Sequence, residues 1–181
     1  MALPKRRRKG DLVRDVDDEK KFEQRIIELA RVTRVVKGGK RMRFRACVAL
    51  GDAQGHRVGI GIAKGSDVAQ SIQKATAQAE KELHTIPLVR ETVPHIVWVK
   101  YGAAQLMMKP APRGTGVKAG GVMRTLCILG GVPNVVGKML GSKNKINNAR
   151  AVLKAFDQLQ RPAVVATTER APSTASNLVI Q

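Results

Sequence analysis

Acidic residues are missing from two long stretches of this chain. No Asp or Glu occurs between Glu28 and Asp52, and none occurs between Glu91 and Asp157. These stretches hold seven and ten lysines and arginines, respectively. Soluble proteins normally mix both signs of charge, because a surface of one sign repels itself. With a formal charge of +19, the chain therefore predicts a polyanionic partner, and RNA is the most economical one.

Aromatic residues are also scarce, and they are Phe22, Phe44, Trp98, Tyr101 and Phe156. Binding of single-stranded RNA on a stacking platform needs several exposed rings in series. The scarcity argues against such a platform and favours contacts to phosphates, sugars and the shape of folded RNA.

Cysteine and histidine are too few and too scattered for a metal site. Cys47 and Cys127 are expected to be small buried hydrophobes in a reducing compartment, not a disulfide framework. The histidines, His56, His84 and His95, share no ligand spacing, so we expect neither a metal nor another cofactor.

Long hydrophobic runs are absent too. The basic run at 5–9 is followed by acids and not by an apolar segment, so it is not a secretory signal. The longest apolar stretches, such as Leu126–Val136, are short and broken by Gly and Pro. We therefore expect a cytoplasmic protein with no membrane partner. Residues 1–18 are interpreted as a flexible arm, either solvated or ordered along RNA.

Hydrophobic periodicity divides the rest into two units. In the first, residues 22–86, we expect a helix near Asp18–Leu29, three strands and a second helix that starts near Ser66 and ends before Pro87. The strands are expected at 32–36, 43–50 and 57–62. Gly59 and Gly61 alternate on the third strand and indicate close approach of another backbone.

After a connector at 87–94, the second unit spans 95–160 and mixes strands with helices. Strands are predicted at 96–100, 104–108 and 135–140, and helices at 120–129 and 145–159. Residues 109–116 form a loop by composition. A tail at 161–181 shows no periodicity. The fold class is thus α+β with two domains.

Three basic segments are candidate RNA contacts. The first is a hairpin around Lys37–Arg41, where cations recur without acids; the alternative is a solvated face, which would normally contain acids. The second is Lys64 before a helix start, a position that favours phosphate. The third comprises two segments of the second unit. For the Gly-rich loop at 112–121 the alternative is a kinase phosphate loop, and for the basic, Asn-bearing segment at 141–147 it is a helix cap with solvated lysines. The candidates are Arg31, Arg34, Lys37, Gly38, Gly39, Lys40, Arg41, Arg43, Arg45, Lys64, Arg113, Thr115, Lys118, Arg124, Lys143, Asn144, Lys145, Asn147 and Arg150.

A kinase is the strongest enzymatic alternative, because Arg113–Gly121 resembles the Gly-rich phosphate loop of small-molecule kinases of the galactokinase type. Phosphoryl transfer needs carboxylates for Mg²⁺, and residues 92–156 contain none. Paired carboxylates and a Ser/His/Asp or Cys/His set are missing as well. We therefore expect no small-molecule substrate and no catalysis.

Several motifs stand in a recognisable order along the chain. In the first half they are the segments 31–33, 36–40, 44–46, 51–64 and 72–75, and in the second half 113–116, 119–124, 131–135 and 141–150. Their order and spacing over residues 20–160 resemble those of the bacterial small-subunit ribosomal protein five (uS5) family. The turn at Gly55–Val58 is one residue longer than the family pattern, and the two ends of the chain have no clear counterpart.

The resemblance implies a first domain like a double-stranded-RNA-binding domain, in the order α-β-β-β-α. It implies a second α/β domain with a left-handed βαβ crossover, a fold shared with those kinases without their chemistry.

The family implies small-subunit rRNA as the main partner, at the junction of head and body. It also implies contacts with small-subunit proteins four and eight, and an influence on decoding accuracy together with proteins four and twelve. Its loop near the head and the spectinomycin site corresponds to Val36, Lys37, Gly38, Gly39 and Lys40. The leading hypothesis is a ribosomal protein. The alternative, a free-standing regulator that binds double-stranded RNA, leaves the basic second domain unexplained.

Overall fold

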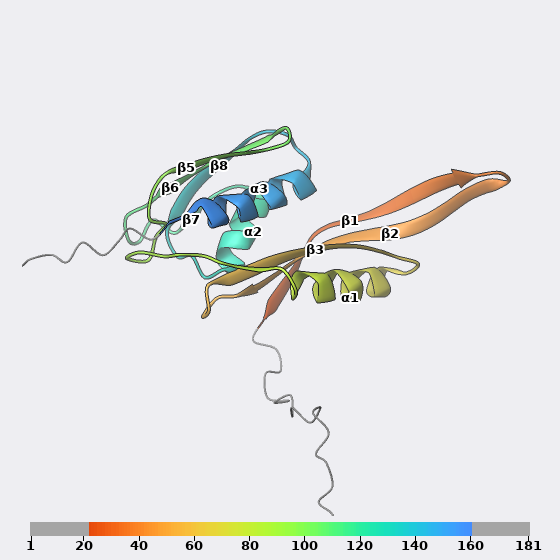
Figure 1. The fold of residues 1–181 in the computed structure, drawn as a ribbon, viewed down its shortest axis with the longest axis horizontal. Coiled ribbons are helices and arrows are strands. Elements are labelled where there is room, and N and C mark those ends of the chain that lie inside the picture. The colour runs from red at the N-terminus through yellow and green to blue at the C-terminus, as the bar shows by residue number, and fades with distance from the viewer. Residues whose placement is uncertain (1–21, 161–181) are drawn as a thin grey trace, which may run out of the picture.

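The first half of the chain forms an antiparallel sheet with a helix on one face. A computed structural model describes residues 22–160, drawn in Figure 1. The sheet has the order β1-β2-β3-β4, and helix α1 crosses one face of it. The bounds are β1 (Glu23–Val36), β2 (Gly39–Asp52), β3 (Arg57–Gly65), α1 (Val68–Ala79) and β4 (Leu83–Thr85).

The second half forms a mixed sheet of order β5-β6-β8-β7, backed by two helices. The bounds are β5 (Val97–Tyr101), β6 (Ala104–Pro110), β7 (Val117–Lys118), α2 (Gly121–Leu129), β8 (Val135–Gly141) and α3 (Lys145–Gln158). Strands β7 and β8 are parallel neighbours joined through α2, which makes the expected βαβ unit. The α+β class is confirmed. Strand β7 was not predicted from the sequence, because two residues carry no periodicity. The second helix was predicted to run on to Pro87, and this is wrong: α1 ends at Ala79, and Leu83–Thr85 forms β4, which pairs with β3.

The predicted helix at Asp18–Leu29 is wrong over the residues that the structure describes. Residues from Glu23 onward belong to β1, which pairs with β2 as far as Glu23↔Gly51. Ile26 and Leu29, the expected buried face, are exposed, while Ile27 packs on the core. Backbone pairing along all of β2 has overridden a short helical pattern. Residues 18–21 and the expected arm and tail lie outside the described residues.

Both faces of β2 are buried, so the first sheet is an inner layer of the molecule. Ala46 and Val48 face α1, where they pack with Ala75 in a small cluster. Cys47 and Ala49 point the other way, into the main core. The continuous buried run from Ala46 to Asp52 follows from this double burial.

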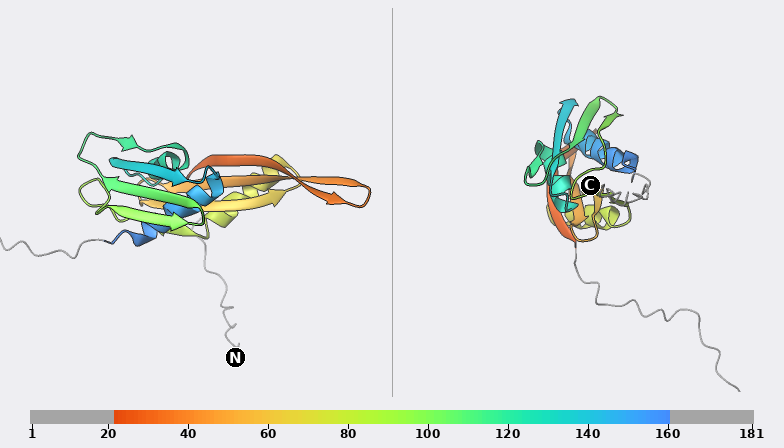
Figure 2. Two further views of the ribbon diagram at one scale, coloured as in Figure 1. Left: turned by 90° about the horizontal axis from the view of Figure 1, so that it is seen from above. Right: turned by 90° about the vertical axis from the view of Figure 1, so that its left-hand side faces the viewer.

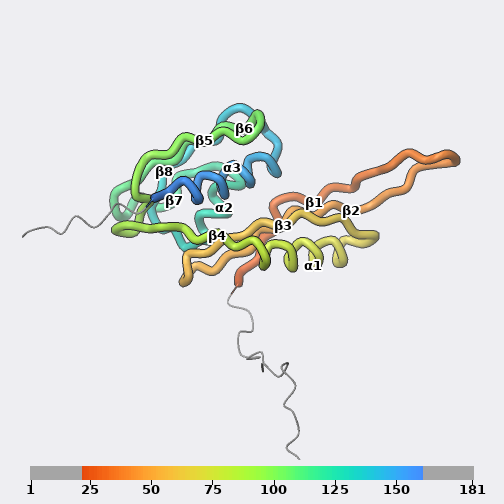
Figure 3. Tube along the Cα trace, in the orientation of Figure 1, coloured from red at the N-terminus to blue at the C-terminus, as the bar shows by residue number. Residues whose placement is uncertain are grey.

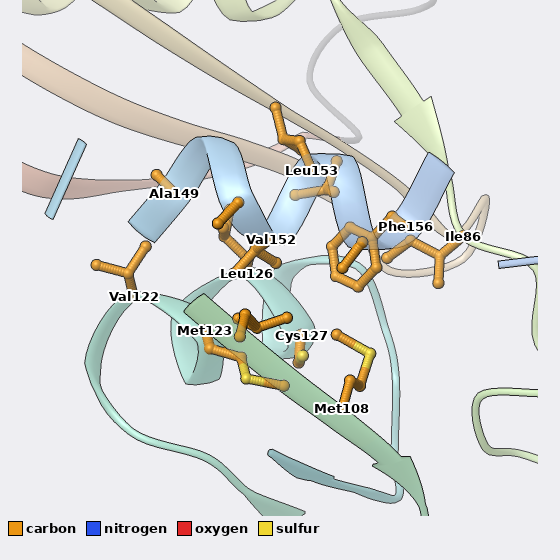
Figure 4. Close-up of a cluster of buried hydrophobic side chains, with 14 of the residues drawn as sticks. Ile86, Met108, Val122, Met123, Leu126, Cys127, Ala149, Val152, Leu153 and Phe156 are labelled. Atoms are coloured by element: carbon orange, nitrogen blue, oxygen red, sulfur yellow. The ribbon is translucent and has the colours of Figure 1, made fainter. Parts of the chain in front are cut away.

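The main core is shared by the two halves. It combines residues of β2 and β3 with those of α2, α3 and the second sheet. Figure 4 shows Ile86 from the first half beside Phe156 of α3, with Cys127 and Leu126 of α2 nearby. The resulting layers are α1, first sheet, α2 with α3, and second sheet, as the trace in Figure 3 also shows.

Two glycines let α1 lie directly on β3. A Cβ at Gly59 would lie 2.4 Å from the carbonyl oxygen of Ala79, and one at Gly61 would lie 1.8 Å from that of Ala75. The prediction that these glycines mark a close backbone approach is confirmed.

The long turn before β3 joins the halves. His56 takes a left-handed backbone conformation (φ 51°), and its Nδ1 lies 3.2 Å from the carbonyl oxygen of Gly130. The backbone N–H of Ile86 donates to the His56 carbonyl at 2.7 Å. Nearby, His84 Nδ1 and the Asp157 carboxylate lie 2.6 Å apart. The register of β2 with β3 is unbroken across this turn.

Strands β1 and β2 extend beyond the first sheet as a two-stranded hairpin. Pairing of β2 with β3 ends at Phe44↔Gly65, whereas pairing with β1 continues to Val36↔Gly39. The hairpin projects from the body at one end of the molecule (Figure 1). Its turn uses Gly38 at a φ of +95°, a conformation that favours glycine.

Candidate RNA interface

One face of the hairpin gathers most of its arginines. Side chains of directly opposite residues share a face of a sheet, and Arg34 is opposite Arg41 while Val32 is opposite Arg43. Lys64 of β3 joins them through its pairing with Arg45. Arg34, Arg41, Arg43 and Lys64 line a groove of about 510 Å³ at the base of the hairpin. The prediction that Arg41, Arg43 and Arg45 share a face of the strand is confirmed.

The projecting part of the hairpin has no internal source of negative charge. Every residue from Thr33 to Arg43 is exposed. No carboxylate within the described range lies within ion-pair distance of Arg34, Arg41 or Arg43. Like charges directly opposite on two strands destabilise a sheet. An anion between them would remove that cost.

Other members of the hairpin differ in environment. Arg31 and Lys40 lie on the opposite face, since their partners are Phe44 and Val35. Arg45 is half-buried and lies 3.5 Å from Glu28, with its Nε buried and unpartnered among the described residues. Arg45 therefore balances an internal carboxylate more than it serves an external anion.

The start of α1 is less open to phosphate than its sequence suggests. The Gln70 side chain accepts from the backbone N–H of Ser66 at 3.1 Å and from its hydroxyl at 2.9 Å. Asp67 is the N-cap residue and places a carboxylate there. Lys64 still projects into solvent, and Lys74 of α1 joins it at a shallow hollow beside Arg43. Lys74 was not predicted, because a lone exposed lysine on a helix carries no signal of its own.

The residues at the start of α3 have mixed roles. Lys143 and Lys145 are exposed. Asn144 caps the helix, because its side-chain oxygen accepts from the backbone N–H of Ile146 at 3.1 Å. Asn147 is half-buried, and the Arg150 guanidinium donates to the Tyr101 hydroxyl at 3.2 Å. The capping interpretation holds for Asn144, and the lysines remain available.

The remaining candidates lie in the second half. Arg113 is exposed but pairs with Glu91 at 3.4 Å. Thr115 closes the loop between β6 and β7, where its backbone N–H donates to Pro112 at 3.2 Å. Lys118 on β7 and Arg124 on α2 are exposed. The loop and the hairpin tip lie at opposite ends of the molecule (Figure 1), so the candidates form a distributed surface and not one pocket.

The described part of the chain offers little to catalysis or to a metal. Within residues 22–160, no group of three or more His, Cys, Asp or Glu side chains could hold an ion. Burial raises the pKa of the Cys47 thiol to about 11 and that of Cys127 to about 12, so neither is a ready nucleophile. No helix in this range is long and apolar enough to cross a membrane.

Comparison with known proteins identifies the family. Residues 22–87 match the model for ribosomal protein S5, N-terminal domain, and residues 99–169 match that for ribosomal protein S5, C-terminal domain. A relative from Synechococcus elongatus, small ribosomal subunit protein uS5, is 44% identical over 157 residues, which cover 86% of this chain and 87% of that protein. The chain belongs to the ribosomal protein S5 family.

Two further relatives carry related names. Small ribosomal subunit protein uS5 of Acaryochloris marina is 44% identical over 167 residues, 92% of each chain. Small ribosomal subunit protein uS5c of Spinacia oleracea is 45% identical over 152 residues. The S5-family chain described here spans about half the length of the spinach protein, at 49%. The family consists of structural proteins, so the prediction that the chain is not an enzyme is confirmed.

Proposed function

We propose that this S5-family chain is a structural constituent of the small ribosomal subunit that holds folded rRNA through phosphate contacts. The charge balance supports this most directly. The described residues contain 23 lysines and arginines against eight aspartates and glutamates. Of these cations, only Arg25, Arg45, Arg57 and Arg113 lie within ion-pair distance of a described carboxylate. The rest form the positive surface that a polyphosphate partner would neutralise.

The hairpin is the part of the molecule that most needs a partner. A two-stranded ribbon is at best marginally stable alone in water. It also exposes apolar side chains at Val35 (74%), Met42 (46%) and Val36 (38%). Contact with RNA or a neighbouring protein would bury these side chains. Phosphates of the RNA would also lie between the arginines and reduce their mutual repulsion. We propose that Val36–Lys40 at the tip reaches the junction of head and body, with a consequent influence on decoding accuracy.

We further propose that the chain acts in cytoplasmic ribosomes and touches small-subunit proteins four and eight. Exposed candidate residues lie on the hairpin at one end of the molecule and on the loop between β6 and β7 at the other, so the chain could contact RNA and several proteins at once. Co-purification of proteins four and eight with a tagged chain, after nuclease treatment, would test these contacts; their absence would limit the proposal to RNA.

The salt dependence of rRNA binding tests the main proposal. Each neutralised phosphate releases counterions, so the logarithm of the binding constant should fall steeply with the logarithm of salt concentration. Lys37→Glu combined with Arg41→Glu should weaken rRNA binding and incorporation into subunits while the fold survives. Lys37→Glu and Lys81→Glu form a matched pair of single charge reversals, because both lysines are exposed and only Lys37 is on the hairpin. Salt-independent binding, or equal effects of the matched pair, would contradict the proposal.

Sucrose-gradient sedimentation of a lysate separates this proposal from a free-standing regulator. A ribosomal constituent should sediment with small subunits and leave little free protein. A chain that sediments only with other RNA would favour the regulator.

A further inference from the structure

The outer face of the second sheet is uncovered. Buried Val97, Val99, Leu106 and Met108 point toward α2 and α3, so the alternate residues point outward. No other element of the described chain lies over this face, which the left view of Figure 2 shows from outside.

Trp98 occupies this outer face on edge strand β5, and it is 62% exposed. It is directly opposite Met107 of β6, which in turn is opposite Lys138 of β8. A large exposed indole on an edge strand is unusual, because edges and surfaces normally carry polar side chains. Two aliphatic side chains are also exposed: Ile96 (52%), directly before β5, and Leu140 (38%), on β8.

Four lysines lie on the same outer face as the tryptophan, at increasing distance across the sheet. Lys100 is two residues from Trp98 on β5, and Lys109 lies on the next strand, β6. Lys138 lies on β8 and Lys118 on β7, the far edge of the sheet. All four lysines are exposed. The face contains no carboxylate, since residues 92–156 include no Asp or Glu. An exposed indole on a face that carries lysines and no acid is complementary to a nucleobase with its flanking phosphates.

We propose that this face docks a short unpaired RNA segment, with one base stacked on Trp98 and neighbouring phosphates on Lys100, Lys109 and Lys138. The inference rests on the proposed rRNA binding and adds a second mode to it. Only one ring is available, so the face binds a single base and is not a stacking platform in series. A protein partner fits less well, because the face carries four exposed lysines and no carboxylate, whereas the centres of protein–protein interfaces are depleted of lysine.

The fluorescence of Trp98 tests the proposal directly, since it is the chain's only tryptophan. The full chain is titrated with a single-stranded RNA of about ten nucleotides, within the usual site size for such surfaces, and with a duplex of equal length. Binding is followed independently by the anisotropy of labelled RNA. We expect the single strand to quench Trp98, and the duplex to bind through phosphate contacts without quenching.

Variants at Trp98 separate stacking from charge. Trp98→Ala should weaken single-strand binding by roughly 5- to 100-fold, the loss of one base–aromatic stack, and leave duplex binding unchanged. Trp98→Phe keeps a ring and should retain most of the affinity. The hairpin variant Lys37→Glu with Arg41→Glu should still show quenching by the short single strand.

Several outcomes would overturn the inference. These are RNA binding without a change in Trp98 fluorescence, equal single-strand affinity of Trp98→Ala and the unaltered chain, and quenching by a glutamate-rich peptide but not by RNA. In each case rRNA binding through the hairpin would stand. Failure of the chain to bind rRNA at all is a different result, and it would reject the proposed function.

Discussion

Arg34 and Arg41 are directly opposite one another on β1 and β2, on the same face of the projecting hairpin. Neither has a carboxylate partner among residues 22–160. Their repulsion destabilises the free hairpin, and a phosphate bound between them would convert it into attraction. The Arg34–Arg41 pair therefore lowers the stability of the free chain while it raises the affinity for RNA.

Replacing Arg41 with Gln should separate these two effects. We expect the free energy of unfolding of the free chain to rise by about 0.2 to 1 kcal/mol, because a like-charge pair is removed. The slope of log binding constant against log salt for rRNA should become shallower by about one, because one phosphate contact is lost. Urea unfolding and salt-dependent filter binding measure the two quantities.

Arg25→Gln is the control for that change. Arg25 also lies on β1, but it pairs with Glu23 at 2.8 Å and lies away from the hairpin tip. Its replacement should leave the salt slope unaltered. A loss of stability in Arg41→Gln, with no change in slope, would show that Arg41 serves the fold and not RNA.

Gly61→Ala should loosen the contact between β3 and α1. The added methyl group would overlap the Ala75 carbonyl oxygen, which belongs to helix backbone and cannot move alone. We expect a loss of about 1 to 3 kcal/mol in unfolding free energy, the usual cost of overpacking. Gly120→Ala is the comparison, because its Cβ would meet nothing nearer than the Met139 methyl at 3.8 Å. Equal losses in both variants would contradict this account.

The Asp52 carboxylate should make stability depend on pH in the acid range. The backbone N–H of Gly55 and the guanidinium of Arg57 hold its pKa below the usual 3.8. A lowered folded-state pKa stabilises the fold above the unfolded-state value and loses that effect as pH falls through the folded-state value. The stability difference between the chain and Asp52→Asn should thus be constant from neutral pH to about 5 and shrink below about 4. A difference that persists unchanged at pH 2 would exclude this role.

Neither half should fold alone, because the main core is shared. A fragment of residues 22–94 would expose Cys47, Ala49, Val58 and Ile60, which are buried against the second half. We expect this fragment to lack a cooperative urea transition, while residues 22–160 unfold in a single transition. Circular dichroism and fluorescence should give coincident curves for the longer chain. Two separate transitions would show independent domains.

Local patterns in the sequence were sufficient for most elements but not for their assembly. The Gly38 turn and the flanking arginines predicted the hairpin. The periodicity of residues 145–159 predicted α3, whose buried face includes Ala149, Leu153 and Phe156. The prediction of a helix near Asp18–Leu29 was wrong, because the pairing of β1 depends on distant β2 and has no local signal. The shared core could not be predicted for the same reason, since it depends on contacts between residues far apart in the sequence. Among candidate contacts, the pairing of Arg45 with Glu28 also required knowing the register of two strands.

The sharing of the core has a consequence for synthesis of the chain. Phe156, near the end of the described residues, lies beside Ile86 and completes the layer under the first sheet (Figure 4). During translation that face of the sheet therefore stays uncovered for on the order of ten seconds after β3 emerges, at typical elongation rates. The nascent chain thus presents a positively charged hairpin on an unfinished body. A chaperone, or the RNA itself, could first bind the nascent chain during that interval.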